Sequence, residues 1–339
     1  MKVGIVGLPN AGKSTLFNAL ARGGAEAAEY PFTTVDPNVA VVPVPDRRLE
    51  RLGETLGIGR LVPEHLEVVD IAGLVRGAHK GEGLGNRFLG HIRDVDAVVH
   101  LVRAFEHPQV AHPHGQVDPV EDLTAIETEL LLADLESAER RLEASTKAAR
   151  SGDRAAIAER DAWERTVAEL AAGRPAPPQA GLLTSKPTLL VANVAEGAGI
   201  PLALAARGAI AVCARDEAEL VELEPEEAEA MRAELGLERG ALESLVGEIY
   251  RLLGLVTFFT AVGDNEIRAR SLRRGSTAYD AAGRVHTDMQ RGFVRAEVVG
   301  WEDLVEAGSF AAAREAGRLR TEGRDYVVAD GDVITIRFG

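Results

Sequence analysis

The chain carries near its N-terminus the octapeptide Gly7-Leu8-Pro9-Asn10-Ala11-Gly12-Lys13-Ser14, a match to the pattern G-x-x-x-x-G-K-S. The β-like run Val3–Val6 precedes it and the helical run Thr15–Leu20 follows it. In this context the glycines let backbone N–H groups face phosphates, and the start of the helix adds positive dipole. We therefore expect a phosphate-binding loop in which Lys13 contacts the β- and γ-phosphates and Ser14 binds magnesium. The expected nucleotide-binding residues of this loop are Asn10, Ala11, Gly12, Lys13, Ser14 and Thr15.

Two further motifs belong with such a loop. A D-x-x-G sequence begins at Asp70, directly after the β-like run Leu66–Val69. At a strand end Asp70 can hold the magnesium shell, and the N–H of Gly73 can meet the γ-phosphate. Upstream, Thr34 is the better candidate and Thr33 the alternative for a threonine that closes over magnesium. The expected magnesium ligands are Ser14, Thr34 and Asp70.

Short β-like runs alternate with helical or glycine-rich segments over residues 1 to about 105, which predicts a parallel α/β sheet. The runs are Val3–Val6, Val39–Val42, Leu66–Val69 and Ala97–Val102, followed after a long gap by Thr188–Ala192 and Ala209–Val212. The gap holds a charged segment, residues 119–172, with helical spacing and a break at residues 151–153. We expect an antiparallel helical hairpin here, inserted into a nucleotide-binding domain formed by residues 1–118 and 180–252.

A different pattern begins at about Leu255 and predicts a small mixed α+β domain over residues 255–339. Its β-like runs include Val256–Thr260 and Phe293–Val299. The final runs, 325–328 and 333–336, flank the turn-rich Ala329-Asp330-Gly331-Asp332 and suggest a β-hairpin.

The composition limits the classes of function. A formal net charge of −15 argues against a protein that coats nucleic acid, so any RNA contact must use local basic patches. No apolar run is long enough to span a bilayer, and the N-terminus has no apolar signal core. We therefore expect a cytoplasmic chain without a membrane segment. The single cysteine, Cys213, cannot form an internal disulfide and is expected to be a buried structural thiol.

Five stretches make the chain resemble the YchF subfamily of Obg-like P-loop proteins. They are residues 4–20, 31–38, 70–86, 281–288 and 323–332. The similarity covers essentially the whole chain. It implies a GTPase-like core with an inserted coiled coil, a C-terminal TGS domain of the β-grasp-like type, and association with the ribosome.

The segment that should read the base departs from the GTPase pattern N-K-x-D. At the equivalent position, after a β-like run, the chain has Asn193-Val194-Ala195-Glu196. A carboxylate cannot pair with adenine N1 because both are acceptors, but the Asn193 side chain or the Val194 backbone can engage the adenine 6-amino group. These residues favour ATP over GTP, and the resemblance implies the same preference. The candidate base-binding residues are Asn193, Val194 and Glu196, with Cys213 and Ala214 as weaker candidates after the last strand.

The residue that orients the attacking water is not the usual glutamine, because Leu74 follows the D-x-x-G glycine. The histidine-rich segment 106–115 offers a replacement, since a histidine there can position water or donate a proton. His112 is the first candidate because it matches a histidine of the family's segment, and His114 is the second. The alternative is a solvated loop with incidental histidines. The candidate catalytic residues are Lys13, Gly73 and His112.

Asn10 is a candidate ligand for a second cation, potassium. In P-loop proteins activated by potassium, an asparagine at this position contributes its side-chain oxygen to a cation between the phosphates, which would stabilise developing negative charge. The alternative is that Asn10 only caps the loop through backbone hydrogen bonds.

Two groups of basic residues are candidates for contact with rRNA phosphates. Around the predicted hairpin tip they are Arg140, Arg141, Lys147, Arg150 and Arg154; in the C-terminal domain they are Arg268, Arg270, Arg273, Arg274, Arg284, Arg291 and Arg295. The alternative is that they are solvated and balance nearby acids. The motifs predict a switch-type ATPase with slow, magnesium-dependent hydrolysis, and the resemblance implies that it acts on the ribosome. A GTPase of ribosome assembly and a nucleotide-regulated binding module with negligible turnover are the alternatives.

Overall fold

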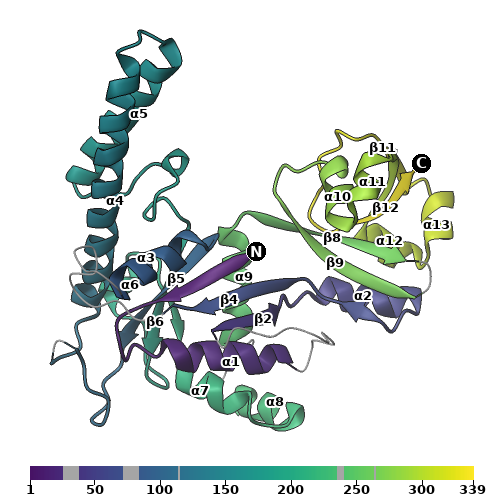
Figure 1. The fold of residues 1–339 in the computed structure, drawn as a ribbon. Helices are drawn as coiled ribbons and strands as arrows, with labels where there is room; N and C mark the ends of the chain where they lie inside the picture. The colour runs from purple at the N-terminus through teal and green to yellow at the C-terminus, as the bar shows by residue number, and fades with distance from the viewer. Residues whose placement is uncertain (26–37, 72–83, 114, 235–239, 263–264) are drawn as a thin grey trace. The chain divides into compact units, whose positions relative to one another are not determined.

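The computed structural model describes residues 1–25, 38–71, 84–113, 115–234, 240–262 and 265–339. The chain divides into two compact units (Figure 1). The first unit comprises residues 1–42 and 67–244, and the second comprises residues 43–66 and 245–339. Each unit is built on a six-stranded sheet.

The first sheet has the strand order β2-β4-β1-β5-β6-β7. Its strands are β1 (Lys2–Val6), β2 (Val39–Pro43), β4 (His65–Asp70), β5 (Ala97–Ala104), β6 (Thr188–Val194) and β7 (Ile210–Val212). β1 is parallel to β4 and β5, and β6 is parallel to β5 and β7. The β-like runs of the sequence therefore form the predicted α/β sheet, and the carboxyl ends of β1 and β4 meet at one edge.

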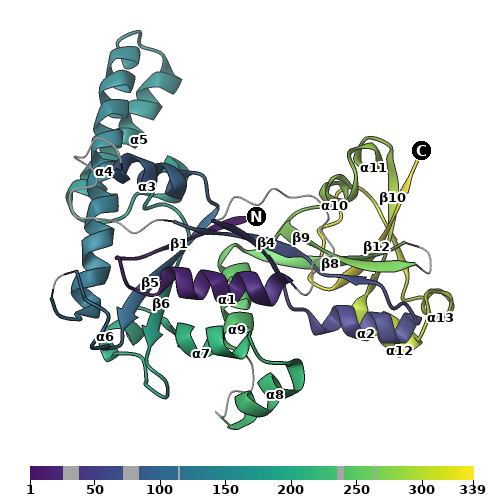
Figure 2. The ribbon, with the colours of Figure 1, turned by 60° about the horizontal axis from the view of Figure 1, so that its bottom comes forward.

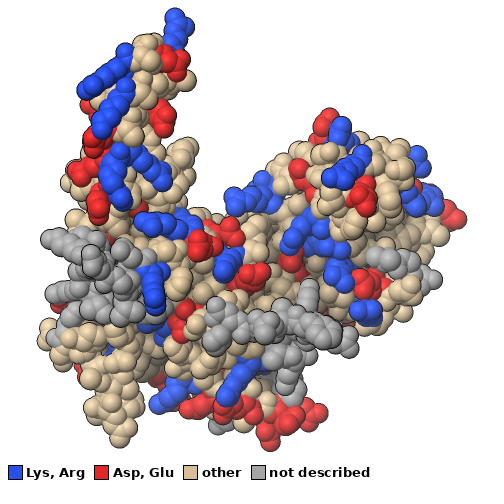
Figure 3. All heavy atoms as spheres, in the orientation of Figure 1, with Lys and Arg blue, Asp and Glu red and all other residues tan. Residues whose placement is uncertain are grey.

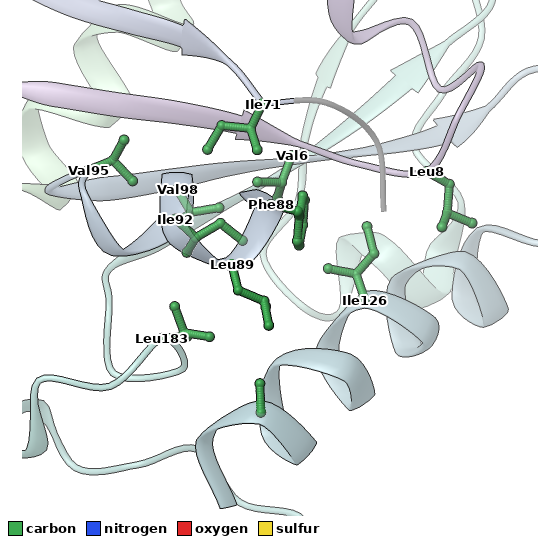
Figure 4. Packing of buried hydrophobic residues seen from close by; sticks show 11 residues of the cluster. Val6, Leu8, Ile71, Phe88, Leu89, Ile92, Val95, Val98, Ile126 and Leu183 are labelled. Carbon is green, nitrogen blue, oxygen red and sulfur yellow. The ribbon is translucent and has the colours of Figure 1, made fainter. Parts of the chain in front are cut away.

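Helices cover both faces of this sheet (Figure 2). α3 (Leu84–Arg93) and α4 (Pro119–Ala149) pack on one face, where apolar side chains of both helices meet those of β1, β5 and Ile71, which directly follows β4 (Figure 4). This core includes Val6, Ile71, Phe88, Ile92, Val98 and Ile126. α1 (Lys13–Ala25) and α7 (Ala214–Leu220) contact each other on the opposite face. Further helical segments of this part of the chain are α6 (Leu202–Ala205), α8 (Pro225–Glu234) and a 3₁₀ turn at Pro178–Ala180. The boundary between the two units falls within α9 (Ala241–Leu252).

The predicted hairpin is present as α4 and α5 (Arg154–Ala171), which pack along each other. Asp118 caps α4 by accepting from the N–H groups of Val120 and Glu121, and Asp153 caps α5 by accepting from Ala156 N. Gly152 has a φ of 79° in the turn between them, a conformation that glycine adopts without steric cost. No helix in the described ranges is long and apolar enough to cross a bilayer.

The second sheet has the order β11-β10-β12-β8-β9-β3. Its strands are β3 (Leu61–Val62), β8 (Leu255–Val262), β9 (Glu266–Arg273), β10 (Phe293–Gly300), β11 (Arg320–Glu322) and β12 (Asp332–Phe338). Its helices are α2 (Arg47–Leu56), α10 (Ala278–Val285), α11 (Thr287–Arg291), α12 (Trp301–Ala307) and α13 (Phe310–Glu315). Most of this β-rich unit, residues 245–339, follows the parallel-sheet unit and its hairpin along the chain, in agreement with the predicted fold class.

The second unit also contains residues 43–66, which differs from the predicted boundary that placed all of 1–118 in the nucleotide-binding domain. Leu49 and Leu52 of α2 are buried in a cluster with apolar residues of β8, β9 and β12. Glu64 accepts hydrogen bonds from Ser271 N at 2.6 Å and Ser271 Oγ at 2.7 Å. These contacts fix the α2–β3 segment to β9.

The predicted C-terminal hairpin is wrong. Residues 325–328 form no strand, and β12 pairs antiparallel with β10 and parallel with β8. The backbone of the segment bonds elsewhere: Tyr326 O accepts from Ala278 N at 2.8 Å, and Val328 N donates to Ser276 O at 3.0 Å. Asp332 Oδ2 accepts from Tyr326 Oη at 2.8 Å and from Ala329 N at 2.9 Å. The carboxylate thereby closes the segment into a turn.

Candidate functional site

The phosphate-binding loop leaves β1 and turns sharply into α1. Asn10 has a φ of 63° and Gly12 a φ of 95°, both in the left-handed region. Asparagine tolerates that region better than most side chains do. Gly7 lies against β5, where an added Cβ would collide with the carbonyl oxygen of Leu101. The two pattern glycines are therefore required by the backbone, as the sequence motif predicts.

Lys13 begins α1 and is 8% exposed. Its Nζ donates to Leu8 O at 3.0 Å, so the ammonium group lies inside the loop. Burial lowers the pKa of Lys13, and the charge of Asp70 opposes that shift. An anion bound in the loop would relieve the desolvation cost of this charge.

Ser14 and Asp70 meet at the carboxyl edge of the first sheet. Ser14 Oγ donates to Asp70 Oδ2 at 2.8 Å. Asp70 Oδ1 is buried and has no hydrogen-bond partner among the described residues. A hydroxyl and a carboxylate with an unsatisfied oxygen fit Mg²⁺, which takes oxygen ligands and few protein groups. The other switch candidates, Thr33, Thr34, Gly73, Leu74 and also His114, lie outside the described residues.

Asn193 joins the phosphate-binding loop to the start of α7. Its Nδ2 donates to Ala11 O at 2.9 Å, and its Oδ1 accepts from Ala214 N at 3.1 Å. The side chain is 4% exposed, and a Cβ added at Gly12 would collide with its Nδ2. From the sequence, this side chain or the Val194 backbone was expected to engage the adenine 6-amino group; in the structure the amide bonds to two backbone segments.

The other candidate base-binding residues follow Asn193 in the sequence or lie at the start of α7. Val194 ends β6, and Glu196 lies in the exposed connection that follows, where it pairs with Arg215 at 3.2 Å. Cys213 occupies the N-cap position of α7 without a side-chain capping bond. Burial raises the pKa of the Cys213 thiol to about 11, so it is protonated near neutral pH. The raised pKa agrees with the expected structural thiol, but Cys213 is half-buried rather than buried.

The loop after β5 is tied to the phosphate-binding loop. Asn10 Nδ2 donates to Ala111 O at 3.0 Å. The guanidinium of Arg103, which is 2% exposed, donates to the carbonyl oxygens of Phe105 and Val110 at 3.1 and 2.9 Å. Sequence reasoning missed Arg103, although a charge inside an otherwise apolar strand is a signal that could have found it.

His112 follows Ala111 directly and pairs with the hairpin helix. Its Nε2 lies 2.8 Å from Asp122 Oδ2, and both side chains are 4% exposed. The structure thus places the predicted catalytic histidine next to a residue that contacts the phosphate-binding loop. Asp122 was not predicted.

The basic residues assigned to the hairpin tip divide into two places. Lys147, Arg150 and Arg154 lie close to the turn between α4 and α5, and basic side chains follow the visible side of the hairpin (Figure 3). Arg140 and Arg141 instead line a cavity of about 510 Å³ with Arg93 and Lys186. Arg141 also stacks on Trp163 at 4.8 Å.

In the second unit, part of the predicted basic group is already paired. Arg268 lies 3.1 Å from Glu266, and Arg284 lies 3.2 Å from Glu64.

Comparisons with known proteins agree with this geometry. The model described as "50S ribosome-binding GTPase" matches residues 2–138, and the YchF-GTPase C-terminal model, described as "Protein of unknown function (DUF933)", matches residues 255–339. The "Ribosome-binding ATPase YchF" of Bacillus subtilis (strain 168) is 46% identical over 363 residues, covering 100% of this chain and 99% of that protein. The protein of the same name from Escherichia coli O157:H7 is 44% identical over 359 residues, covering 99% of each.

A solved structure supports the same relationship. The structure of the Schizosaccharomyces pombe YchF GTPase superposes on this chain with a TM-score of 0.89 and 34% sequence identity. The match covers 99% of this chain and 97% of the yeast protein's chain. The resemblance stated from the sequence motifs is confirmed over the full length: this chain belongs to the YchF family of P-loop proteins.

Proposed function

We propose that the chain is a ribosome-associated, switch-type ATPase that binds ATP with magnesium and hydrolyses it slowly. The observation that carries the proposal is the phosphate-binding loop with Lys13 inside it and the Ser14–Asp70 pair at its edge. Ser14 and Asp70, with Thr34, would hold the magnesium ion, which supplies positive charge to the phosphates when bound. The names of the bacterial relatives support the choice of ATP and of the ribosome.

Hydrolysis on this scaffold depends on positioning and electrostatics. The loop N–H groups and Lys13 offset negative charge that develops on the γ-phosphate, and Gly73 N–H adds to them. With leucine in place of the usual glutamine, His112 is the group that positions the attacking water. Its neighbour Ala111 is 3.0 Å from Asn10 Nδ2, which places the histidine close to the phosphate-binding loop.

The ribosome would contact the hairpin tip and the C-terminal unit. A protein that binds ribosomes in this way would act in the cytoplasm. Lys147, Arg150 and Arg154 offer phosphate contacts near the turn between α4 and α5. Co-sedimentation with purified ribosomes checks this contact, and a chain that stays in the supernatant at low salt would contradict it.

The proposal predicts at least about tenfold tighter binding of ATP than of GTP, or about 1.4 kcal/mol. The segment 193–196 lacks the aspartate that accepts from guanine N1–H and the 2-amino group. Asn193 is committed to Ala11 and Ala214, so the Val194 backbone is the group left to meet the adenine 6-amino group. Calorimetric titration with both nucleotides in parallel measures the ratio. Tighter binding of GTP than of ATP would contradict the proposed preference for adenine and would favour the alternative, a GTPase.

We also propose that Asn10 binds a potassium ion that activates hydrolysis. Its Nδ2 is occupied by Ala111 O, so its Oδ1 is the atom offered to a cation. Replacing potassium with sodium at constant ionic strength should lower the steady-state rate severalfold. Asn10→Gly keeps the left-handed backbone and should lose the potassium effect. Equal rates of the native chain in the two salts would show that Asn10 binds no activating cation and only links the phosphate-binding loop to the loop after β5.

A further inference from the structure

The pair formed by His112 and Asp122 is shielded from water. The 2.8 Å contact joins His112 Nε2 to Asp122 Oδ2, with 4% of each side chain exposed. A hydrogen bond from an imidazole to a carboxylate in such surroundings is strong and directional. It therefore determines how the His112 ring is oriented.

The backbone on both sides of His112 is fixed. Arg103 and Asn10 hold the carbonyl groups of Val110 and Ala111, and Gly115 N donates to His112 O at 3.0 Å. Consecutive Cα atoms are about 3.8 Å apart, so His112 lies within one residue of the contact with the phosphate-binding loop. The freedom that remains to this residue is rotation of its side chain, and Asp122 limits that rotation.

Asp122 is itself held on a rigid element. It lies in the first turn of α4, where its N–H donates to Asp118 O at 2.9 Å. Leu123 and Ile126, on the same helix, are 2% and 0% exposed and pack in the core of the first unit. Side chains on packed helices keep their place better than side chains on loops do. The carboxylate is therefore a fixed reference for the histidine on the loop.

We infer that Asp122 is a positioning residue for ATP hydrolysis: it holds the imidazole of His112 in the orientation that positions the attacking water. The inference rests on the proposed role of His112. A base oriented by a third group is the arrangement that enzymes use repeatedly to activate a nucleophile. Because α4 continues from Asp122 to Ala149 near the hairpin turn, a partner bound at the turn would contact the same helix that carries the carboxylate. The ribosomal partner would then act on hydrolysis through this pair.

Asp122→Asn should lower kcat about tenfold or more and change KM for ATP less than about twofold, because a positioning residue acts on the transition state through His112 and not on the binding of ATP. Asp122→Glu, which keeps a carboxylate, should retain more of kcat. The matched control is Asp134→Asn on the same helix. Asp134 is 1% exposed and accepts from Leu183 N and Thr184 N at 2.9 and 2.7 Å. That substitution should lower the melting temperature and leave kcat unchanged.

A double variant separates positioning from a structural role. If Asp122 acts through His112, then Asp122→Asn should cause no further loss of kcat in a His112→Ala background. Equal losses from Asp122→Asn and Asp122→Glu, or multiplicative losses in the double variant, would overturn the inference. Native kcat in Asp122→Asn with reduced kcat in His112→Ala would overturn it while keeping the role of His112. Native kcat in His112→Ala would overturn both.

Discussion

Replacing Lys13 with alanine is expected to lower kcat for ATP hydrolysis by roughly a thousandfold. The Nζ group lies inside the loop, 3.0 Å from Leu8 O, in a site that is largely closed to water. A positive charge held there needs no reorganisation when charge moves onto the γ-phosphate, so its removal affects the transition state directly. Triphosphate binding should weaken as well.

The fold of the variant is not expected to suffer, because a buried ammonium group carries a desolvation cost that alanine removes. Single-turnover hydrolysis measures the effect, and thermal unfolding confirms that the chain is folded. Lys147→Ala is the matched control, since Lys147 is 65% exposed and forms a surface ion pair with Glu143. If Lys13→Ala hydrolyses ATP within tenfold of the native rate, the phosphate-binding loop does not take part in hydrolysis as proposed.

The first sheet was predictable because its information is local. Each of its strands is a short apolar run, and the glycine-rich loop between β1 and α1 can be recognised from eight contiguous residues. Asp70 was found in the same way, since it directly follows such a run. The hairpin followed from helical spacing and one break, which the structure places between the end of α4 at Ala149 and the start of α5 at Arg154.

The assignment of residues 43–66 to the second unit was not predictable from local pattern. Leu49 and Leu52 show that α2 has an apolar face, but not which sheet covers it. The residues that bury this face lie more than 200 positions further along the chain. Similarly, residues 325–328 have strand-like composition, and the turn closed by Asp332 outweighed that propensity.

The candidate site shows the same limit. Lys13, Ser14 and Asp70 were assigned from motifs, whereas Arg103 and Asp122 act through partners that no spacing identifies. Asn193 was assigned from its place in the motif, and its two hydrogen bonds were not part of that assignment. Its position after β6 suggested contact with the base, but its two partners come from the loops on either side of it in space.

Asn193→Ala is the second substitution with a large expected effect. It removes the hydrogen bonds to Ala11 O and from Ala214 N and leaves two buried backbone groups without these partners. The expected loss is about 2–5 kcal/mol in the free energy of unfolding, measured by urea denaturation. Because Ala11 belongs to the phosphate-binding loop, ATP and GTP should both bind more weakly and by the same factor.

Glu196→Gln is the control for this prediction, since Glu196 belongs to the same motif but is 58% exposed and pairs with Arg215 on the surface. Its effect on unfolding should stay within about 0.5 kcal/mol. The ratio of ATP to GTP affinity distinguishes the two roles of Asn193. If Asn193 only holds the phosphate-binding loop in place, its loss weakens ATP and GTP binding equally, because the loop binds phosphates that both nucleotides carry. If the variant instead changes the ratio of ATP to GTP affinity and keeps the native stability, Asn193 contacts the base, since only such a group can alter the preference between adenine and guanine.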